Sequence, residues 1–296
     1  MVTLFVAAAL FSVTSCKKDN SANNTVNDPD PVATVDAAQS DADASGQFED
    51  VFNVTMGVQS TDAGEDIGLG TGANIIYKPA DPSGALSPDS TSRCFTVTVI
   101  PKIERQFPKT VTVDFGSGCL GKDGKLRKGK IVTIFTGPMR IPGSKTSTTF
   151  VGYSVDSFAI AGTMTVENTS LSNKQAWRTE VIDGKVTNTQ SGFWRKYAGV
   201  KERVQIEGNG TPFYLQDDVF QISGHAEGSN SNGNMWASKI ISPVIRKYSC
   251  KWRSKGTVEI NRKSNTAVAI LDYGDGSCDN KATITINGVT HEITLR

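Results

Sequence analysis

Most of this chain after Phe48 is built from short stretches in which apolar and polar or β-branched residues alternate. A period of two places successive side chains on opposite faces, which is the pattern of a β-strand with one buried face. Turns of Gly, Asn and Asp separate the stretches, and Asn287-Gly288 is the clearest hairpin signal. We therefore predict an all-β domain, either an antiparallel β-sandwich or a curved, barrel-like sheet, with no amphipathic helix after residue 15.

Two parts of the chain resemble each other. The shared pattern is an alternating strand, then Asp-aromatic-Gly-x-Gly and a cysteine, in KTVTVDFGSGC (109–119) and AVAILDYGDGSC (267–278). A shorter pattern, Asp-x-Phe-x-aliphatic, recurs at 50–54, 156–160 and 218–222. These matches predict two related β-units, about 48–136 and 216–296, around a central segment of about 137–215, all within a single β-rich domain spanning 48–296.

The first residues carry the signals of export. An apolar run from Leu4 to Phe11 has the length of a signal peptide and is too short to cross a bilayer. It leads into Val13-Thr14-Ser15-Cys16, which resembles a lipobox. The resemblance implies a signal peptide over 1–15 and acylation of Cys16, with the acyl chains as the membrane anchor. The alternative is an ordinary signal peptide in which Cys16 has no role.

Charge divides the chain unevenly. Residues 17–50 hold two lysines and eight acids, a net charge of −6, whereas residues 51–296 hold 29 basic and 22 acidic residues, a net charge of +7. Residues 21–47 are mostly Asn, Asp, Ala, Ser, Thr and Pro, without an aromatic residue before Phe48. Such a composition buries too little apolar surface to repay its ordering entropy. It predicts a lipidated, flexible, acidic tether over 16–47.

Four cysteines remain after Cys16. In an exported chain an even number predicts disulfides, and four cysteines allow three pairings. The repeat favours Cys94–Cys119 and Cys250–Cys278, each worth roughly 3–4 kcal/mol through loop entropy. The alternative is a set of reduced, buried cysteines, or one bridge only.

Two segments are candidates for ligand-binding loops. Residues 272–279 are rich in Asp and Gly, but their spacing differs from the ligand pattern of a calcium loop, and we predict a turn. The segment 121–130 is a basic hairpin tip that could meet anionic polymers. Lysines in such a loop more often keep it hydrated and prevent pairing between sheet edges. We predict no metal and no cofactor, because the chain has no Cys-x-x-Cys and its two histidines lie near no cysteine.

The tryptophans are the candidate ligand-binding residues, as a platform on which sugars could stack. Aromatic side chains of β-sandwiches are nevertheless mostly core. An arginine directly follows three of them, which on a strand places each pair on opposite faces and favours buried indoles with solvated arginines. The four tryptophans are Trp177, Trp194, Trp236 and Trp252, and the three arginines are Arg178, Arg195 and Arg253.

Catalysis finds little support. His225 and His291 have no nucleophile motif nearby. The acid pairs Glu49/Asp50 and 217/218 are sequence neighbours, so their side chains diverge on a strand instead of converging across a cleft. We predict no catalytic residue and no enzymatic activity.

Several of these features occur together in one family. Lys17-Lys18-Asp19 after the lipobox resembles the start of envelope lipoproteins from Bacteroidota, and the acidic tether with the repeated Asp-aromatic-Gly-x-Gly…Cys motif is similar to a family of uncharacterised lipoproteins from that phylum. The resemblance implies an outer-membrane address, periplasmic or surface-exposed, and implies no activity. We predict a non-enzymatic binding module for a glycan or another envelope polymer, with a structural component of an envelope assembly as the alternative. Nucleic acid is not expected as a partner, since the sequence holds no concentrated basic patch.

Overall fold

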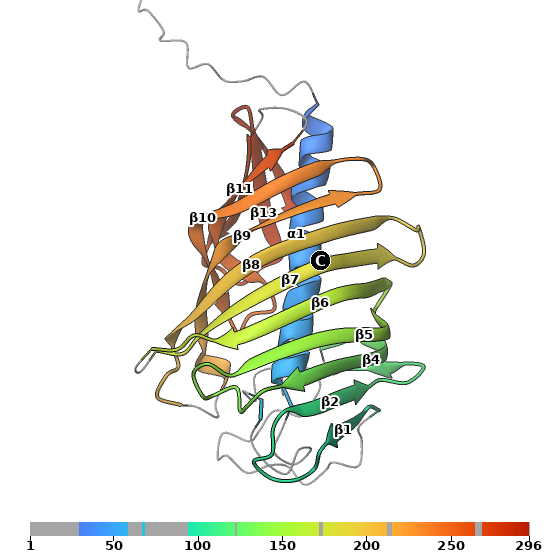
Figure 1. The fold of residues 1–296 in the computed structure, drawn as a ribbon. Coiled ribbons are helices and arrows are strands. Elements are labelled where there is room, and N and C mark those ends of the chain that lie inside the picture. Colours follow the sequence, from blue (N-terminus) through green and yellow to red (C-terminus); the bar gives the residue numbers. More distant parts are fainter. Residues whose placement is uncertain are drawn as a thin grey trace, which may run out of the picture.

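The computed structural model shows one open, strongly curved antiparallel sheet that wraps around a long helix (Figure 1). It describes residues 30–58, 67–68, 94–121, 123–171, 174–211, 215–263 and 268–295. Within these ranges the sheet has 14 strands, ordered β1-β2-β4 and then consecutively to β14, with β3 paired to β4. The predicted all-β class is confirmed.

The helix α1 spans Pro31–Met56 and precedes every strand. The strands are β1 (Thr96–Ile100), β2 (Lys109–Asp114), β3 (Cys119–Leu120), β4 (Leu126–Phe135), β5 (Lys145–Val155), β6 (Phe158–Asn168), β7 (Ala176–Asn188), β8 (Trp194–Glu207), β9 (Val219–Asn230), β10 (Met235–Lys247), β11 (Arg253–Arg262), β12 (Val268–Asp275), β13 (Lys281–Ile286) and β14 (Val289–Thr294). The last two strands form the predicted hairpin, and Asn287 and Gly288 take the positive φ angles, 52° and 78°, that such a turn requires.

Helix α1 corrects the prediction made for the N-terminal segment. The flexible tether is wrong for residues 31–47, and the absence of a helix is wrong for Pro31–Met56, which includes the start of the predicted β-unit 48–136. Asp30 caps the helix, since its Oδ1 accepts from the N–H of Ala33 at 3.1 Å, and Pro31 occupies the first turn. Residues 16–29, including Cys16, lie outside the described residues, as does the predicted signal peptide.

Enclosure explains why this helix has no amphipathic pattern. Fifteen of its 26 residues are buried, and they include Asp41, Asp50 and Asn53. A helix on a protein surface needs a polar stripe for water, but one wrapped by a sheet has protein on several sides. Asp43, Glu49 and Asp50 contact cations of the sheet, so polar complementarity with the sheet replaces apolar periodicity.

The core is divided along α1. Its N-terminal half packs small side chains, such as Ala38, against β9–β13, where Trp236 and Leu271 are fully buried. Its C-terminal half packs Phe48 and Phe52 mainly against β1–β8. Small residues allow close approach of the helix to the sheet, and aromatic residues fill the wider end.

Glycine bulges bend the sheet toward the helix. Strand pairing slips by one residue at Gly162 and again at Gly256, with φ of 112° and 108°. A Cβ at position 162 would lie 2.7 Å from the carbonyl oxygen of Asp183, so a larger residue does not fit there. Bulges of this kind increase local twist and curl a sheet.

The repeated motif makes the same local contact in both units, although the first copy is a turn after β2 and the second copy lies in β12 as far as Asp275. Asp114 Oδ1 accepts from the N–H of Gly116 at 2.9 Å, and Asp272 Oδ1 accepts from the N–H of Gly274 at 2.8 Å. Both glycines have positive φ, 57° and 96°. Each carboxylate therefore binds the backbone two residues further on. The turn predicted for residues 272–279 is wrong for 272–275, which continue β12 beside an irregularity in its pairing with β11.

The shorter match is not a structural repeat. Residues 50–54 lie in α1, whereas 156–160 and 218–222 lie at the starts of β6 and β9. One continuous sheet carries the strands of both predicted β-units and of the central segment between them.

Both favoured disulfides are present. Cys94 and Cys119 are bridged with a Cα–Cα distance of 5.2 Å, and Cys250 and Cys278 with 5.6 Å. Each bridge lies beside one copy of the repeated motif, so the similarity of the two units correctly predicted the pairing.

Candidate functional site

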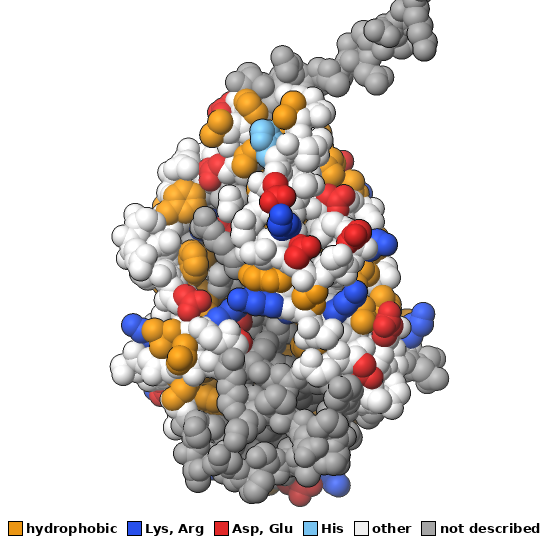
Figure 2. Space-filling view, turned by 180° about the vertical axis from the view of Figure 1, so that it is seen from behind, with side chains coloured by type: hydrophobic (Ala, Val, Ile, Leu, Met, Phe, Trp, Pro, Cys, Tyr) orange, Lys and Arg blue, Asp and Glu red, His pale blue; other side chains and the backbone are white. Residues whose placement is uncertain are grey.

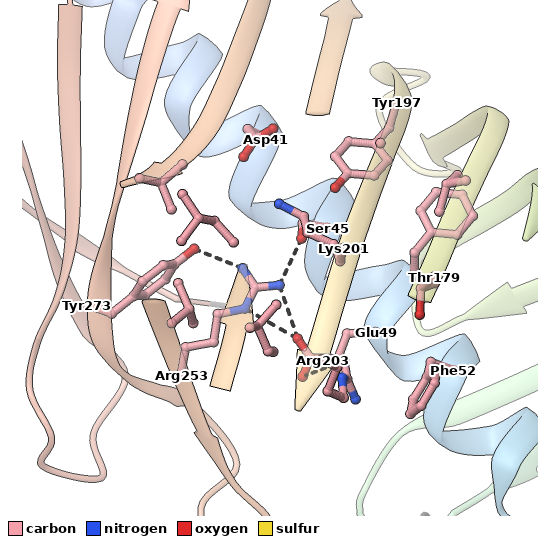
Figure 3. A pocket seen from close by; sticks show the side chains of 17 residues that line it. Asp41, Ser45, Glu49, Phe52, Thr179, Tyr197, Lys201, Arg203, Arg253 and Tyr273 are labelled. Atoms are coloured by element: carbon pink, nitrogen blue, oxygen red, sulfur yellow. Dashed lines mark hydrogen bonds and ion pairs between the residues drawn. The ribbon is translucent and has the colours of Figure 1, made fainter. Parts of the chain in front are cut away.

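A narrow cavity lies between α1 and the inner face of strands β7–β12 (Figure 3). About 50 Å³ of it is open to the centres of water-sized molecules, within about 620 Å³ of unfilled space that includes the opening to solvent. One water needs roughly 10–15 Å³ on the first measure, so the narrow part has room for a few waters or one small molecule.

One face of α1 forms a wall of this cavity. Asp41, Ser45, Glu49 and Phe52 contribute to the lining, together with Phe48. Residues three and four apart lie on the same side of a helix, which explains why this set of side chains shares a direction.

Strand β8 forms the opposite wall. Tyr197, Gly199, Lys201 and Arg203 alternate along it, and all four line the cavity. A Cβ at Gly199 would lie 2.7 Å from the Cβ of Ala226, so the glycine is required by the close approach of the neighbouring strand.

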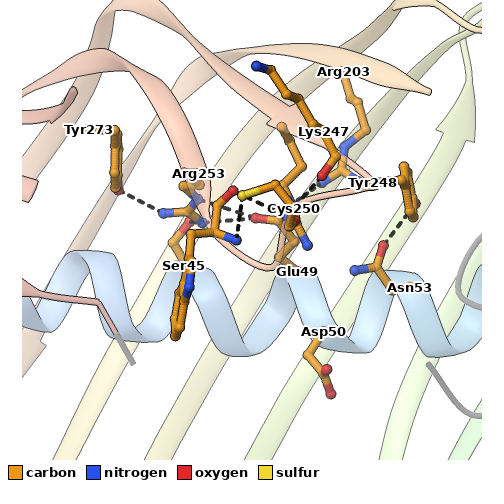
Figure 4. A network of polar contacts seen from close by, with 12 residues as sticks. Ser45, Glu49, Asp50, Asn53, Arg203, Lys247, Tyr248, Cys250, Arg253 and Tyr273 are labelled. Carbon is orange, nitrogen blue, oxygen red and sulfur yellow. Dashed lines mark hydrogen bonds and ion pairs between the residues drawn. The ribbon is translucent and has the colours of Figure 1, made fainter. Parts of the chain in front are cut away.

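Glu49 lies at the centre of a network of three arginines from three strands (Figure 4). Its Oε2 accepts from Nε and Nη2 of Arg253 at 3.3 and 3.1 Å. Its Oε1 lies 3.3 Å from Nε of Arg246 and 3.6 Å from Nη2 of Arg203. Burial alone would raise the pKa of Glu49, but the three guanidinium groups outweigh it and lower this pKa to about 2.

The guanidinium group of Arg253 is held on every side. Its Nη1 donates to the hydroxyl of Tyr273 at 2.8 Å, and its Nη2 also donates to Oγ of Ser45 at 2.9 Å. Figure 3 shows this arginine spanning the space between β12 and α1. It is therefore a fixed part of the cavity wall.

Among the described residues that line the cavity, Arg203 and Lys201 are the cations that remain incompletely paired. Arg203 is 6% exposed and stacks on the ring of Phe52 at 4.2 Å, and its buried Nε and Nη1 have no hydrogen-bond partner among the described residues. No hydrogen bond or ion pair within the described part reaches the amine of Lys201, and burial lowers its pKa although Asp41 opposes this effect. The amine points into the cavity in Figure 3.

Asp41 does not neutralise Lys201 by contact because its carboxylate is engaged elsewhere. Its Oδ1 accepts from Nε1 of Trp236 at 3.1 Å and from Oγ of Ser238 at 2.8 Å. Three basic and two acidic side chains thus line the cavity, and a fourth base, Arg246, reaches Glu49 from outside the lining. The cavity carries an excess of positive charge.

Asp50, the next residue of α1, belongs to a second and closed network. Nε and Nη2 of the fully buried Arg127 donate to its Oδ2 and Oδ1 at 3.3 and 2.7 Å, while Lys125 donates to Oδ1 at 2.9 Å. Arg127 also donates to both oxygens of Asp123. Two acids and two bases satisfy one another here.

Further acids of α1 bind the sheet in the same way. Asp36 Oδ2 accepts from the side-chain amides of Asn230 and Asn234 at 2.9 and 2.7 Å, and Asp43 Oδ2 lies 2.9 Å from Nη2 of Arg195. The uneven charge distribution of the sequence therefore reflects a negative helix inside a positive sheet. Outside, Figure 2 shows a band of basic side chains across the middle of the face seen from behind.

The four tryptophans do not form a shared surface. Trp177 and Trp236 are buried at 1% and 0% exposure, in separate core clusters. Trp194 opens β8 and Trp252 lies between β10 and β11, both half-buried and each beside different lysines. The structure thus brings none of the candidate ligand-binding residues together.

The arginines that follow tryptophans divide into two kinds. Arg178 is exposed, as predicted, whereas the expectation of a solvated arginine is wrong for the buried Arg195 and for Arg253, whose side chain is only 15% exposed. Alternation holds for Trp177-Arg178 and Trp194-Arg195, whereas Trp252 precedes β11 and is about as exposed as Arg253. The buried face is the arginine's face wherever an acid of α1 lies opposite.

The basic hairpin tip is also used internally. Lys125 and Arg127 bind Asp50, and Lys130 lies 2.8 Å from Asp114. The simpler interpretation of solvated lysines is therefore wrong for Lys125 and Arg127, because both cations are held by the helix.

The described residues hold no other assembly of reactive groups. Both histidines are exposed on strands, and no cluster of three or more His, Cys, Asp or Glu that could bind a metal occurs in the described ranges. Among the same residues, no helix is both long enough and apolar enough to cross a membrane.

The sequence interpretation missed the cavity entirely. Its signal was present as Tyr197-x-Gly199-x-Lys201-x-Arg203, an inward-facing row with two cations on a strand otherwise typical of a half-buried sheet. Comparison of the chain with protein-family models, with curated proteins and with solved structures gave no match, so its function is argued from geometry.

Proposed function

We propose that this chain is an exported, lipid-anchored protein of the cell envelope that acts as a non-enzymatic binding module, with the cavity beneath α1 as its binding site. Two disulfides support an oxidising compartment. The lipobox-like segment ending at Cys16 supports lipid anchoring. The resemblance to envelope lipoproteins of Bacteroidota supports an outer-membrane address.

One observation carries the assignment of the binding site. Arg203 keeps two buried N–H groups without an acceptor, beside the amine of Lys201, which has none either among the described residues. An unsatisfied buried donor costs about 1–3 kcal/mol, and more when it is charged. A bound ligand that accepts these hydrogen bonds would recover that cost.

The anchoring part of the proposal is tested by acylation. In the native organism, Cys16→Ala should abolish incorporation of labelled palmitate and move the protein from the membrane fraction to the soluble fraction. Cys278→Ser, which removes a disulfide cysteine, is the matched control and should still be labelled. Palmitate incorporation that survives Cys16→Ala would refute the anchor.

The binding part is tested by native mass spectrometry of the full chain purified from its own envelope. We expect a mass excess that disappears on unfolding and is absent from a variant with a filled cavity, Val181→Trp. Val181 lines the cavity from β7. The control is Ile182→Trp on the opposite face of the same strand, where the residue is exposed. Absence of any bound molecule from the unmodified chain would contradict the proposed site.

One specific observation supports the alternative function, a structural component of an envelope assembly. Strand β14 closes the sheet at one edge, pairs only with β13 among the described strands, and is exposed at five of its six residues. Such an edge can add a strand from another protein. Thr290→Pro would block this pairing, and crosslinking of the assembly in the envelope would measure its loss.

A further inference from the structure

We infer that the ligand is a small organic acid with a single carboxylate and a short apolar body, and that Lys201 and Arg203 bind its carboxylate. The inference rests on the proposed function only in placing the binding site in this cavity. The two side chains are two residues apart on one face of β8, about 7 Å along the strand, so one carboxylate between them can accept from both.

The balance of charge in the cavity selects an anion. Among the described residues, Glu49 is the one acid that contacts the arginines there, and it is shared by Arg203, Arg246 and Arg253. One carboxylate cannot neutralise three guanidinium groups, and Asp41 is turned toward Trp236. A second negative charge entering the cavity would therefore be attracted, and its desolvation cost would be offset by cations that are already desolvated.

The same two acids limit the charge of the ligand. A dianion such as phosphate would place two negative charges near Asp41 and Glu49, with only two incompletely paired cations to receive them. A monoanion suits the charge excess better. Nε and Nη1 of Arg203 lie on different edges of its guanidinium group, so a carboxylate beside the Lys201 amine would accept from one of them.

The remaining lining indicates an apolar body. Ile222, Ile240, Val244 and Val258 form the walls on β9–β11, and Phe48 closes the side of the helix. Apolar walls with a few converging polar groups are typical of sites for small organic ligands. The narrow volume of about 50 Å³ favours a short chain of about four to six carbon atoms.

A purely structural role for these cations is less consistent with the neighbouring network. Arg127 lies equally deep, and acceptors surround its guanidinium on Asp50 and Asp123. Adjacent residues of the same helix, Asp50 and Glu49, therefore belong to one cation site that protein acids complete and to another that they do not. Completion by a ligand is the simplest account of that difference.

The experiment is calorimetric titration of the full chain carrying Cys16→Ala, which removes the acylation site. Butyrate, hexanoate and octanoate are the carboxylate probes, hexanamide is the neutral counterpart, and inorganic phosphate is the dianion. We expect hexanoate or butyrate to bind and to raise the melting temperature, and hexanamide to do neither. Lys201→Met should weaken carboxylate binding at least tenfold, and Lys196→Met, on the opposite face of β8, should leave it unchanged.

Each other result overturns the inference. If hexanamide binds as tightly as hexanoate, the charge of the ligand does not contribute to binding. If Lys201→Met binds with unchanged affinity, the Lys201 amine does not contact the ligand. Binding of phosphate alone would replace the organic acid with an inorganic anion and leave the binding module intact. If no probe binds but native mass spectrometry still detects a bound molecule, the inference that the ligand is a carboxylate is refuted and the proposed function is not. A second variant, Arg203→Lys, guards against misfolding because it keeps the charge and removes the guanidinium N–H groups, and we expect it to bind hexanoate more weakly than the parent.

Discussion

Glu49 and Asp50 are neighbours on α1, yet they point from different sides of the helix into networks of different kinds (Figure 4). Asp50 meets Arg127 and Lys125, and Asp123 completes a set of two acids and two bases. Glu49 meets three arginines with Lys201 nearby, and the bases outnumber the acids. The two networks have the same chemistry and differ only in whether the protein itself completes them.

This difference separates a network that only stabilises the fold from one that can also bind a ligand. The Asp50 network holds the C-terminal half of α1 against β4 with its guanidinium groups satisfied, so nothing is left for a ligand. The Glu49 network also holds the helix, but it leaves donors directed into a cavity. We therefore expect changes in the first network to affect stability alone, and changes in the second to affect stability and binding together.

The largest expected effect is in the closed network. Arg127→Met would leave Asp50 and Asp123 buried without their guanidinium group, and we expect it to lower the free energy of unfolding by about 3–5 kcal/mol in urea titrations at pH 7. Hexanoate should not restore the loss.

Two further variants test this interpretation. Lys128→Gln changes the exposed neighbour on β4 and should alter stability by less than about 0.5 kcal/mol. Asp50→Asn combined with Arg127→Met should recover part of the loss, because the buried charge is removed along with its partner. A double variant no more stable than Arg127→Met would show that the pair is not coupled.

Each disulfide lies next to one of the two networks, so removing one disulfide at a time tests the difference between the Asp50 network and the Glu49 network. Cys119 pairs directly with Arg127 across β3 and β4, and the carbonyl of Cys250 accepts from Arg246, which contacts Glu49. Replacing either pair of cysteines by serine should cost about 3 kcal/mol of unfolding free energy. Only loss of the Cys250–Cys278 bridge should also weaken hexanoate binding, as measured by calorimetry.

Glu49→Gln should destabilise the protein by about 3 kcal/mol at pH 7, since three cations lose their shared acid. The pKa of Glu49 is about 2 in the folded state and about 4.5 unfolded, so its contribution is fully present above pH 4.5 and is lost as pH falls toward 2. The difference between parent and variant should therefore shrink over that range in urea titrations. At pH 7, hexanoate should stabilise Glu49→Gln more than the parent, a rescue that Asp50→Asn should lack.

Part of this arrangement could be predicted from the sequence. Alternation predicted the strands, the Asp-aromatic-Gly-x-Gly repeat predicted both disulfides, and Asn287-Gly288 predicted the final hairpin. These are local signals, because a strand, a turn and a repeated cysteine each depend on residues close together in the chain.

The helix and the cavity could not be predicted because they depend on distant partners. Residues 31–47 look like a tether when only apolar burial is counted, and they fold because Asp43 and other acids find partners such as Arg195 152 positions away. The opposite charges of the two segments were visible in the sequence. They did not show that one segment lies inside the other.

Asp218 adds an interior acid with an amide partner in place of a contacting cation. Gln205 donates to its Oδ1 at 2.7 Å, and burial together with the neighbouring Asp217 raises its pKa to about 7. A raised carboxyl pKa means that the charged form costs stability above pH 7, that the cost fades as pH falls, and that none remains below pH 3.8. We expect Asp218→Asn to stabilise the protein by about 1–2 kcal/mol at pH 8 and to be neutral near pH 4, in contrast to Glu49→Gln. Equal effects at both pH values would contradict this.

Lys201→Met has the smallest expected effect and separates the two kinds of network most clearly. Burial lowers the pKa of the Lys201 amine, so its charge opposes folding at neutral pH, and methionine of similar length should raise the free energy of unfolding by up to about 1 kcal/mol without ligand. The gain should vanish above pH 10.5, where the unfolded lysine is neutral as well. In saturating hexanoate the order should reverse, because only the parent is stabilised by the bound acid. If Lys201 did not lower the free energy of unfolding without ligand, it would have a structural role like that of Arg127. If it lowers the stability of the empty protein and raises that of the occupied protein, its role is ligand binding.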